Sequence, residues 1–137
     1  MDEVQPLAGV ASYLFEMGHL KRTTRAGWLL LGIPQPETVA EHSFRAAVIA
    51  IVLASMEGAD VGRAAALAVL HDSHETRIGD VPSVGRAYVT TATPEAISVH
   101  QTSAMPDGPA KVLQDLVAEF EGHRDNRSAG GSRRRQA

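Results

Sequence analysis

Cysteine is absent from the 137-residue sequence, which excludes disulfide bonds and thiolate metal sites. Any metal ion would therefore have to be bound by imidazole and carboxylate groups. Aromatic residues are scarce, with one Trp, two Tyr and three Phe, so the core must consist mainly of Ala, Val, Leu and Ile. The net charge is -3, which gives no global indication of nucleic-acid binding.

Signals for export or membrane insertion are also missing. The chain begins Met1-Asp2-Glu3, without the basic residues of a signal peptide. The longest strongly apolar stretch, residues 46–56, is shorter than the roughly 20 residues that a membrane-spanning helix needs. We therefore expect a cytoplasmic protein with no membrane partner.

The hydrophobic pattern predicts an all-α fold, a compact bundle of about five helices in a single domain. The helix that follows Thr38 is apolar on nearly every face, so we expect it to be central. The segments 21–37 and 83–92 are expected to be loops, because Gly and Pro interrupt the first and the second has no clear period. The expected helices cover about 6–18, 38–56, 60–77, a short stretch from Thr93, and 109–120.

Helix starts are marked by local signals. Thr38-Val39-Ala40-Glu41 has the form of a capping box, in which the Thr hydroxyl and the Glu carboxylate each accept a backbone N–H. Asp60 can cap the next helix, and Thr93-Pro94 can start another. Gly58 is expected to end the helix that begins after Thr38.

The composition changes after Gly122. Residues 123–137 contain five Arg and no aliphatic side chain larger than Ala, so they cannot bury apolar surface. We therefore expect a helical domain over 1–122 and a disordered Arg-rich tail over 123–137. Such a tail could bind nucleic acid or an acidic partner. Charge runs are usually only solvated, however, and we expect no nucleic-acid partner.

The sequence His71-Asp72-Ser73-His74-Glu75 gathers groups that can bind a metal and move a proton. On a helix, His71 and Glu75 share one face, while Asp72 projects about 100° around the axis, so adjacent His and Asp can both reach a cation beside the helix. For this segment alone, a solvated helix end is the simpler interpretation.

His42 changes this balance, although a single His in the first turn of a core helix is more often structural than a ligand. Two imidazoles and one carboxylate from two packed helices would form a mixed nitrogen and oxygen set suited to Mn, Fe, Co, Ni or Zn. A bound divalent ion generates hydroxide near neutral pH, and Glu75, one turn beyond His71, could transfer a proton there.

These segments together resemble the HD-domain superfamily of phosphohydrolases, with its H…HD…D ligand pattern, and more narrowly its 5'-deoxynucleotidase group. The resemblance covers about residues 7–82. It is carried by four stretches in the family order: 20–28, 36–43, 71–75 and 79–80.

The resemblance implies an HD-like helical fold, a divalent metal ion (Mn, Co, Fe, Ni, Zn or Mg) and a role for each matching residue. His74 matches no family role and is expected to be an exposed helix residue. Trp28 lies near the sugar of the substrate or is a core anchor. The implied roles are metal binding for His42, His71 and Asp72, handling of the attacking water for Glu75, a second acid at the rim for Asp80, and phosphate binding for Arg25.

One part of the family pattern is not found. The fourth ligand is an Asp on a late helix, and the nearest candidate here, Asp125, lies in the segment expected to be disordered. Asp107 and Asp115 are interpreted as a cap residue and a solvated residue. We therefore expect the final helix to be missing, with an ending like that of a truncated or frame-shifted chain. Its loss would expose apolar surface on the central helices and favour self-association.

Two functions follow from the resemblance. The first is that of a metal-dependent phosphomonoesterase, which releases phosphate from deoxynucleoside 5'-monophosphates. The resemblance also suggests a homodimer. The alternative is a degenerate, non-catalytic HD domain that binds a nucleotide or a protein partner, and the missing ligand favours it.

Overall fold

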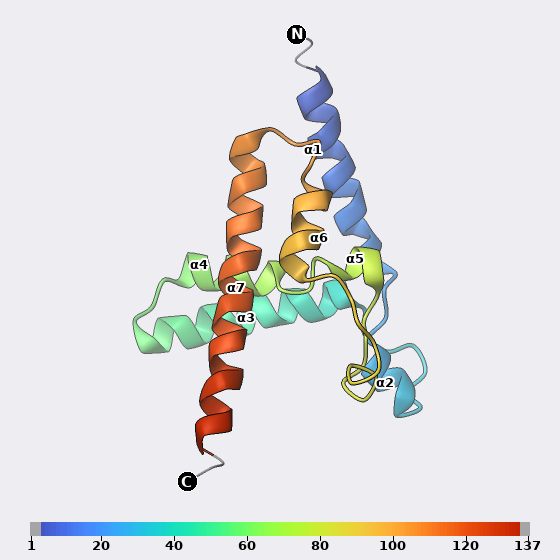
Figure 1. Ribbon diagram of the computed structural model, residues 1–137, viewed down its shortest axis with the longest axis vertical. Coiled ribbons are helices and arrows are strands. Elements are labelled where there is room, and N and C mark those ends of the chain that lie inside the picture. Colours follow the sequence, from blue (N-terminus) through green and yellow to red (C-terminus); the bar gives the residue numbers. More distant parts are fainter. Residues whose placement is uncertain (1–3, 135–137) are drawn as a thin grey trace.

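The protein is described by a computed structural model that covers residues 4–134, with side-chain surroundings for residues 7–127. Its described part contains helices and no strands, which confirms the all-α prediction (Figure 1). Five helices have eight or more residues, in agreement with the expected number. The elements are α1 (Val4–Met17), η1 (Gly18–Lys21), α2 (Ala26–Leu30), α3 (Val39–Glu57), α4 (Val61–Leu70), α5 (Glu75–Ile78), α6 (Pro94–Gln101) and α7 (Asp107–Arg134).

The helices of the fold pack mainly in two pairs, α3 with α4 and α6 with α7. Helices α3 and α4 pack side by side, and α7 crosses α4 and packs along α6 (Figure 1). Helix α1 approaches the turn before α7 so closely that a Cβ on Gly9 would lie 1.8 Å from the carbonyl oxygen of Ala104. Only glycine fits at that crossing.

The helix starts have the caps that the sequence predicts. The Thr38 hydroxyl accepts from the Glu41 N–H at 3.2 Å, and the Glu41 carboxylate accepts from the Thr38 N–H at 3.0 Å, which completes the capping box of α3. Asp60 and Thr93 cap α4 and α6, each through a side-chain oxygen that accepts from the backbone N–H three residues later. Gly58 ends α3 with a φ of 69°, a left-handed conformation that favours glycine.

The helix predicted over residues 60–77 is interrupted. Helix α4 ends at Leu70, and residues 71–74 form a turn before α5 begins at Glu75. The Ser73 N–H donates to the Leu70 carbonyl and the Glu75 N–H to that of Asp72, each at 3.0 Å, so the turn closes more tightly than an α-helix. The prediction of one continuous helix was therefore wrong, and the face that His71 and Glu75 were expected to share does not exist.

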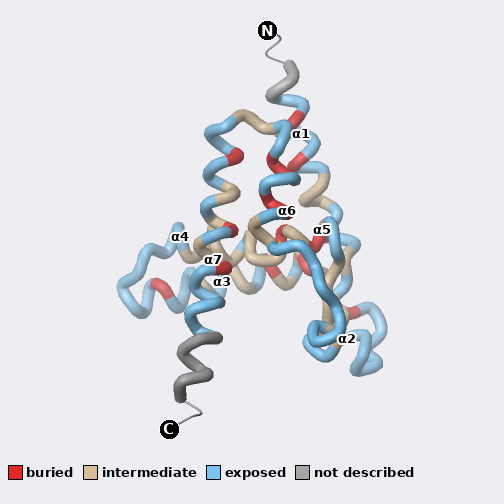
Figure 2. Tube along the Cα trace, viewed as in Figure 1, coloured by how far each residue is buried: buried red, intermediate tan, exposed pale blue. Residues whose placement is uncertain are grey.

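The buried residues lie where the helices face one another (Figure 2). Helix α3 was expected to be central, yet Phe44 is 70% and Met56 78% exposed. The apolar stripe of α1 is also uncovered at Leu14 and Phe15, because helical spacing identifies an apolar face without saying what covers it. The buried hydrophobic residues are Tyr13, Leu20, Val39, Ala54, Ile97, Ala110 and Val117.

Helix α3 is the one helix of the described residues that is long and apolar enough to cross a membrane, by length and composition alone. The expectation drawn from residues 46–56 therefore underestimated the length of this apolar element, which has 19 residues. Core helices of globular proteins meet the same criterion. Here the first two turns of α3 carry Glu41, His42 and Arg45.

Helix α7 is longer than the sequence predicts. The helix continues to Arg134, whereas the composition of residues 123–137 predicts a disordered tail, and disorder of this segment in solution stays a prediction. Once the turns up to Glu121 are packed, each further residue adds a helical hydrogen bond without needing apolar contacts. Residues 122–127 are all exposed and contribute nothing to the core, as their composition predicts. Residues 135–137 of the predicted tail lie outside the described part of the chain.

Candidate metal centre

His42, His71 and Asp72 come together where the start of α3 meets the end of α4. The capping box fixes the first turn of α3, which carries His42, and the turn after α4 carries the other two residues. The His42 Nε2 atom lies 3.2 Å from His71 Nε2 and 3.6 Å from Asp72 Oδ2. His71 Nε2 and Asp72 Oδ2 are 3.0 Å apart. One donor atom from each residue can therefore contact a single ion, since all three lie within 4.8 Å of one another.

The donor chemistry fits a divalent transition-metal ion. The second ring nitrogen of His71, Nδ1, lies against the Ala68 carbonyl, which can only accept a hydrogen bond. This contact assigns a proton to Nδ1 and turns Nε2 toward His42 and Asp72, the side on which a metal would bind. Two imidazoles and one carboxylate are the mixed set that such ions prefer. The three residues that the sequence singles out as ligands are thus adjacent, and their role as ligands remains a prediction.

The charges of the three groups depend on one another. Burial raises the pKa of Asp72, but the hydrogen bond and charge of His71 outweigh it and hold that pKa below its usual value. Burial lowers the pKa of His71, and the Asp72 carboxylate reverses the shift, so the net direction is upward. Burial, together with the Arg25 charge, lowers the pKa of His42. The group therefore holds an ionised carboxylate that attracts positive charge from a proton or a cation.

Arg25 lies at the edge of this group. Its Nη1 atom is 3.7 Å from Asp72 Oδ2, and its buried Nε atom has no hydrogen-bond partner. The segment before α2 is attached to the start of α3, since the Arg25 N–H donates to the Glu37 carbonyl at 3.0 Å. Asp80 holds the next residue, because its Oδ2 atom accepts from the Ala26 N–H at 2.8 Å. Arg25 therefore points donors at the site from a segment held at two points.

Glu75 is a buried acid beside the group, with 5% of its surface exposed. Burial, followed by the charges of Asp72 and Asp80, raises its pKa to about 9. Its Oε2 atom has no hydrogen-bond partner. Without a nearby cation this carboxyl is therefore protonated at neutral pH, and it can act as a proton donor there.

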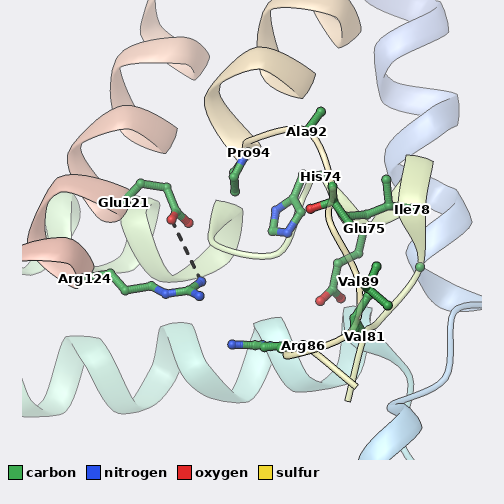
Figure 3. A pocket seen from close by; sticks show the side chains of 12 residues that line it. His74, Glu75, Ile78, Val81, Arg86, Val89, Ala92, Pro94, Glu121 and Arg124 are labelled. Carbon is green, nitrogen blue, oxygen red and sulfur yellow. Dashed lines mark ion pairs between the residues drawn. The ribbon is translucent and has the colours of Figure 1, made fainter. Parts of the chain in front are cut away.

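A pocket of about 160 Å³ opens next to Glu75 (Figure 3). It lies between α5, the segment 81–92 and α7, and Arg86, Arg124 and Glu121 line it. His74 also lines the pocket and is partly buried, so the prediction of an exposed helix residue was wrong. The turn that interrupts the predicted helix directs His74 inward.

Trp28 and Arg25 line a separate groove beside α2, with Gly27 and Leu31. Trp28 is 44% exposed, so the core-anchor interpretation was wrong. A contact between this ring and the sugar of a substrate remains a prediction.

Several residues near the site were not predicted from the sequence. Phe120 packs on His71 with ring centroids 5.3 Å apart, and Glu121 is buried beside Arg124 at 3.9 Å. The helical stripe that ends at Phe120 was the one available signal for this contact. Asp125, the nearest candidate for a fourth ligand, is exposed on α7 and does not belong to the metal-binding group of the described residues.

Comparison with known proteins gives these residues a family context. A family model described as HD domain matches residues 17–129. The chain is similar to the 5'-deoxynucleotidase HDDC2 of Homo sapiens, with 32% identity over 111 residues, 80% of this chain and 54% of that protein. A 5'-deoxynucleotidase of Vibrio parahaemolyticus is 37% identical over 100 residues, 69% of this chain and 49% of that one. The chain thus spans about half the length of the curated relatives it matches.

Solved structures share the same arrangement of helices. A conserved hypothetical protein from Pyrococcus furiosus is 31% identical with a TM-score of 0.63, over 81% of this chain and 68% of that chain. A protein from Pyrococcus horikoshii is 30% identical with a TM-score of 0.66, over 80% and 62%. With the family match, these similarities show that the chain belongs to the HD domain family.

Proposed function

We propose that the protein is a metal-dependent phosphohydrolase that releases phosphate from deoxynucleoside 5'-monophosphates. The observation that carries the proposal is the group of His42, His71 and Asp72, whose donor atoms lie within 4.8 Å of one another, with the Arg25 guanidinium 3.7 Å from Asp72. Relatives named as 5'-deoxynucleotidases match most of the chain and support this substrate class.

The metal-binding residues would be His42, His71 and Asp72, and the ion would be one of Mn, Co, Fe, Ni, Zn or Mg. When bound, such an ion supplies the Lewis-acid character that phosphate ester hydrolysis requires. Asp72 is ionised, and His71 turns Nε2 toward that carboxylate, where a cation would take the place of the proton that Nε2 shares with it. The observed contacts among the three side chains support this assignment.

Arg25 would bind the phosphate group. A guanidinium offers paired N–H donors in a plane that matches two phosphate oxygens, and the buried Nε of Arg25 has no other partner. Asp80 would keep this segment in place through its hydrogen bond to Ala26. Trp28, in the groove next to Arg25, would contact the sugar.

Glu75 would transfer the proton that hydrolysis requires. Its carboxyl holds a proton at neutral pH because burial and the charges of Asp72 and Asp80 raise its pKa to about 9. A cation at the neighbouring group would lower this pKa toward neutrality, so Glu75 could give its proton to the oxygen of the leaving nucleoside and take one from the attacking water. The negative charge that then remains on Glu75 would be stabilised by the cation at the neighbouring group.

The alternative function is a non-catalytic HD domain that binds a nucleotide. One observation favours it: the metal-binding group of the described residues has three members, with no fourth carboxylate. A smaller ligand set binds a metal more weakly, while the pocket beside Glu75 and the groove beside Arg25 are still available to a nucleotide.

An assay of phosphate release separates the two functions. Purified protein is incubated with dAMP, dCMP and dUMP in Mn²⁺ or Co²⁺, with Asp72→Asn as the inactive control. Release that depends on both the metal and Asp72 supports the phosphohydrolase. Nucleotide binding without release under any of these metals, in folded protein, supports the non-catalytic domain instead.

We also propose that the protein is a cytoplasmic homodimer that binds neither nucleic acid nor membranes. The exposed apolar side chains of α3, among them Phe44, Val48 and Met56, would be covered by a second copy of the chain. Sedimentation should show a dimer that Val48→Glu dissociates. Flotation with liposomes, or retention on DNA at physiological salt, would contradict this proposal.

A further inference from the structure

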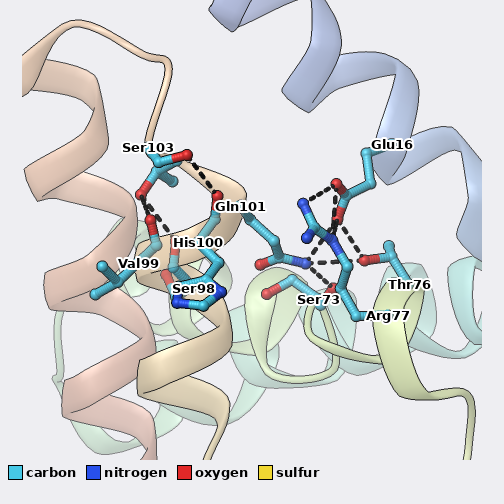
Figure 4. A network of polar contacts seen from close by, with 10 residues as sticks. Glu16, Ser73, Thr76, Arg77, Ser98, Val99, His100, Gln101 and Ser103 are labelled. Carbon is cyan, nitrogen blue, oxygen red and sulfur yellow. Dashed lines mark hydrogen bonds and ion pairs between the residues drawn. The ribbon is translucent and has the colours of Figure 1, made fainter.

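Residues 71–74, which we call the ligand turn, are bordered by a polar cluster that is buried at Gln101 and Ser73 and reaches the surface at Arg77 (Figure 4). The cluster joins the end of α1, the helix α5 and the end of α6. Its centre is the Glu16 carboxylate, which accepts from the Arg77 guanidinium at 2.6 Å and from the Thr76 hydroxyl at 2.6 Å. Neither Glu16 nor Arg77 has been assigned a part in the proposed reaction.

Gln101 connects this cluster to the ligand turn. Its side-chain amide nitrogen, Nε2, lies 3.0 Å from the Ser73 carbonyl, 2.8 Å from the Thr76 hydroxyl and 3.0 Å from Glu16 Oε2. Two N–H groups are thus shared among three acceptors. Gln101 is 7% exposed, so water cannot readily replace these bonds.

The Ser73 carbonyl lies between Asp72 and Glu75 and has no regular helical hydrogen-bond partner. It follows Asp72 directly and precedes Glu75 by two residues, and it lies beyond the end of α4, where carbonyls lose their regular helical partners. The Thr76 N–H donates to it over a long distance of 3.5 Å. The Gln101 amide, at 3.0 Å, is therefore its shorter partner, and it comes from a helix that is distant in sequence.

The cluster itself is held in place by charge. The hydrogen bond from Arg77 lowers the pKa of Glu16, so the carboxylate remains ionised at neutral pH and remains an acceptor for Gln101. The Arg77 Nε atom lies 3.0 Å from both Glu16 oxygens, which fixes the carboxylate plane. The Gln101 side chain is therefore oriented before any ion or substrate binds.

We propose that Gln101 is a positioning residue for the metal centre. Through the Ser73 carbonyl it fixes the ligand turn, and with it the directions of Asp72 and Glu75. The effect on metal binding rests on the proposed function, whereas the restraint on the turn does not. Contacts of this kind outside the ligand set change metal affinity by roughly 10- to 100-fold in other metal sites.

Two variants and one matched control test the proposal. Gln101→Leu removes the amide, and Gln101→Asn keeps an amide that is too short to reach Ser73. Gln114→Leu is the control, because Gln114 makes the same kind of bond, 2.8 Å to the Thr102 hydroxyl, outside the ligand turn. Hydrogen exchange of residues 71–78 is measured in metal-free protein, and the Kd for Co²⁺ is measured by titration.

Both Gln101 variants should speed exchange in residues 71–78 and raise the Kd for Co²⁺ about tenfold, while Gln114→Leu leaves both at wild-type values. A Kd that changes no more than in the control would overturn the proposal, even if exchange is faster. If the wild-type protein binds no Co²⁺, the proposed function fails. Exchange alone then decides about the turn, and unchanged exchange in the Gln101 variants overturns the restraint as well.

Discussion

The buried carboxyl of Glu75 predicts how the stability of the metal-free protein depends on pH. Its folded-state pKa of about 9 lies well above the ordinary value of 4.5 for this carboxyl. Between these values the folded protein binds a proton at Glu75 that the unfolded chain has lost. The free energy of unfolding therefore falls as the pH rises from 4.5 to 9.

The loss of unfolding free energy follows from the pH interval over which only the folded protein keeps this proton. The 2.5 pH units between 4.5 and 7, at about 1.4 kcal/mol each, give a destabilisation of about 3.5 kcal/mol at pH 7. Glu75→Gln keeps the shape of the neutral acid and carries no charge at any pH. The variant should therefore be as stable as the wild type near pH 4.5 and more stable by about 3.5 kcal/mol at pH 7.

Urea unfolding in EDTA at pH 4.5, 7 and 8.5 measures the difference between the two proteins. Other groups titrate equally in both, so the difference isolates Glu75. Glu57→Gln, which removes an exposed carboxylate at the end of α3, is the control and should track the wild type. A constant difference across this pH range would refute the reasoning, because it would mean that Glu75 titrates alike in the folded and unfolded chains.

Three further substitutions have expected outcomes. Arg25→Lys should raise KM for dAMP about tenfold while Co²⁺ affinity changes less than twofold, because an ammonium lacks the planar pair of N–H donors that matches two phosphate oxygens; equal changes in both would contradict its role. Thr38→Ala should lower the free energy of unfolding by about 1 kcal/mol through loss of the capping box, measured in urea, and no loss would contradict the role of that cap. Gly9→Ala should cost about 3 kcal/mol or prevent folding, because its Cβ would overlap the Ala104 carbonyl oxygen; a melting temperature equal to that of the wild type would show that α1 can shift away.

Local signals made the helix starts predictable. A capping box such as Thr38 to Glu41 depends on four consecutive residues, so the sequence contains all of its parts. The same holds for the caps at Asp60 and Thr93. The ligand group was predictable for another reason, since the family pattern relates His42 to His71 and Asp72 across a distance that no local rule covers.

Features that depend on distant partners were not predictable. Nothing near Leu70 signals that the helix ends there, and the Ser73 carbonyl in the turn that follows has its partner in Gln101, 28 residues later. The inward position of His74 follows from that turn. The outer face of α3 was misjudged for a related reason: its apolar sequence predicts burial, but no described element covers Phe44 or Met56.

The most direct test of the metal centre is a Co²⁺ titration of the metal-free protein, followed by optical absorption and repeated with His71→Ala. One Co²⁺ per chain should bind to the wild type and give the visible ligand-field bands of a site with nitrogen and oxygen ligands. His71→Ala should lose the bands and at least about a hundredfold in affinity, since one of three donors is removed. Equal binding by the two proteins would contradict the assignment of His42, His71 and Asp72 as the metal centre.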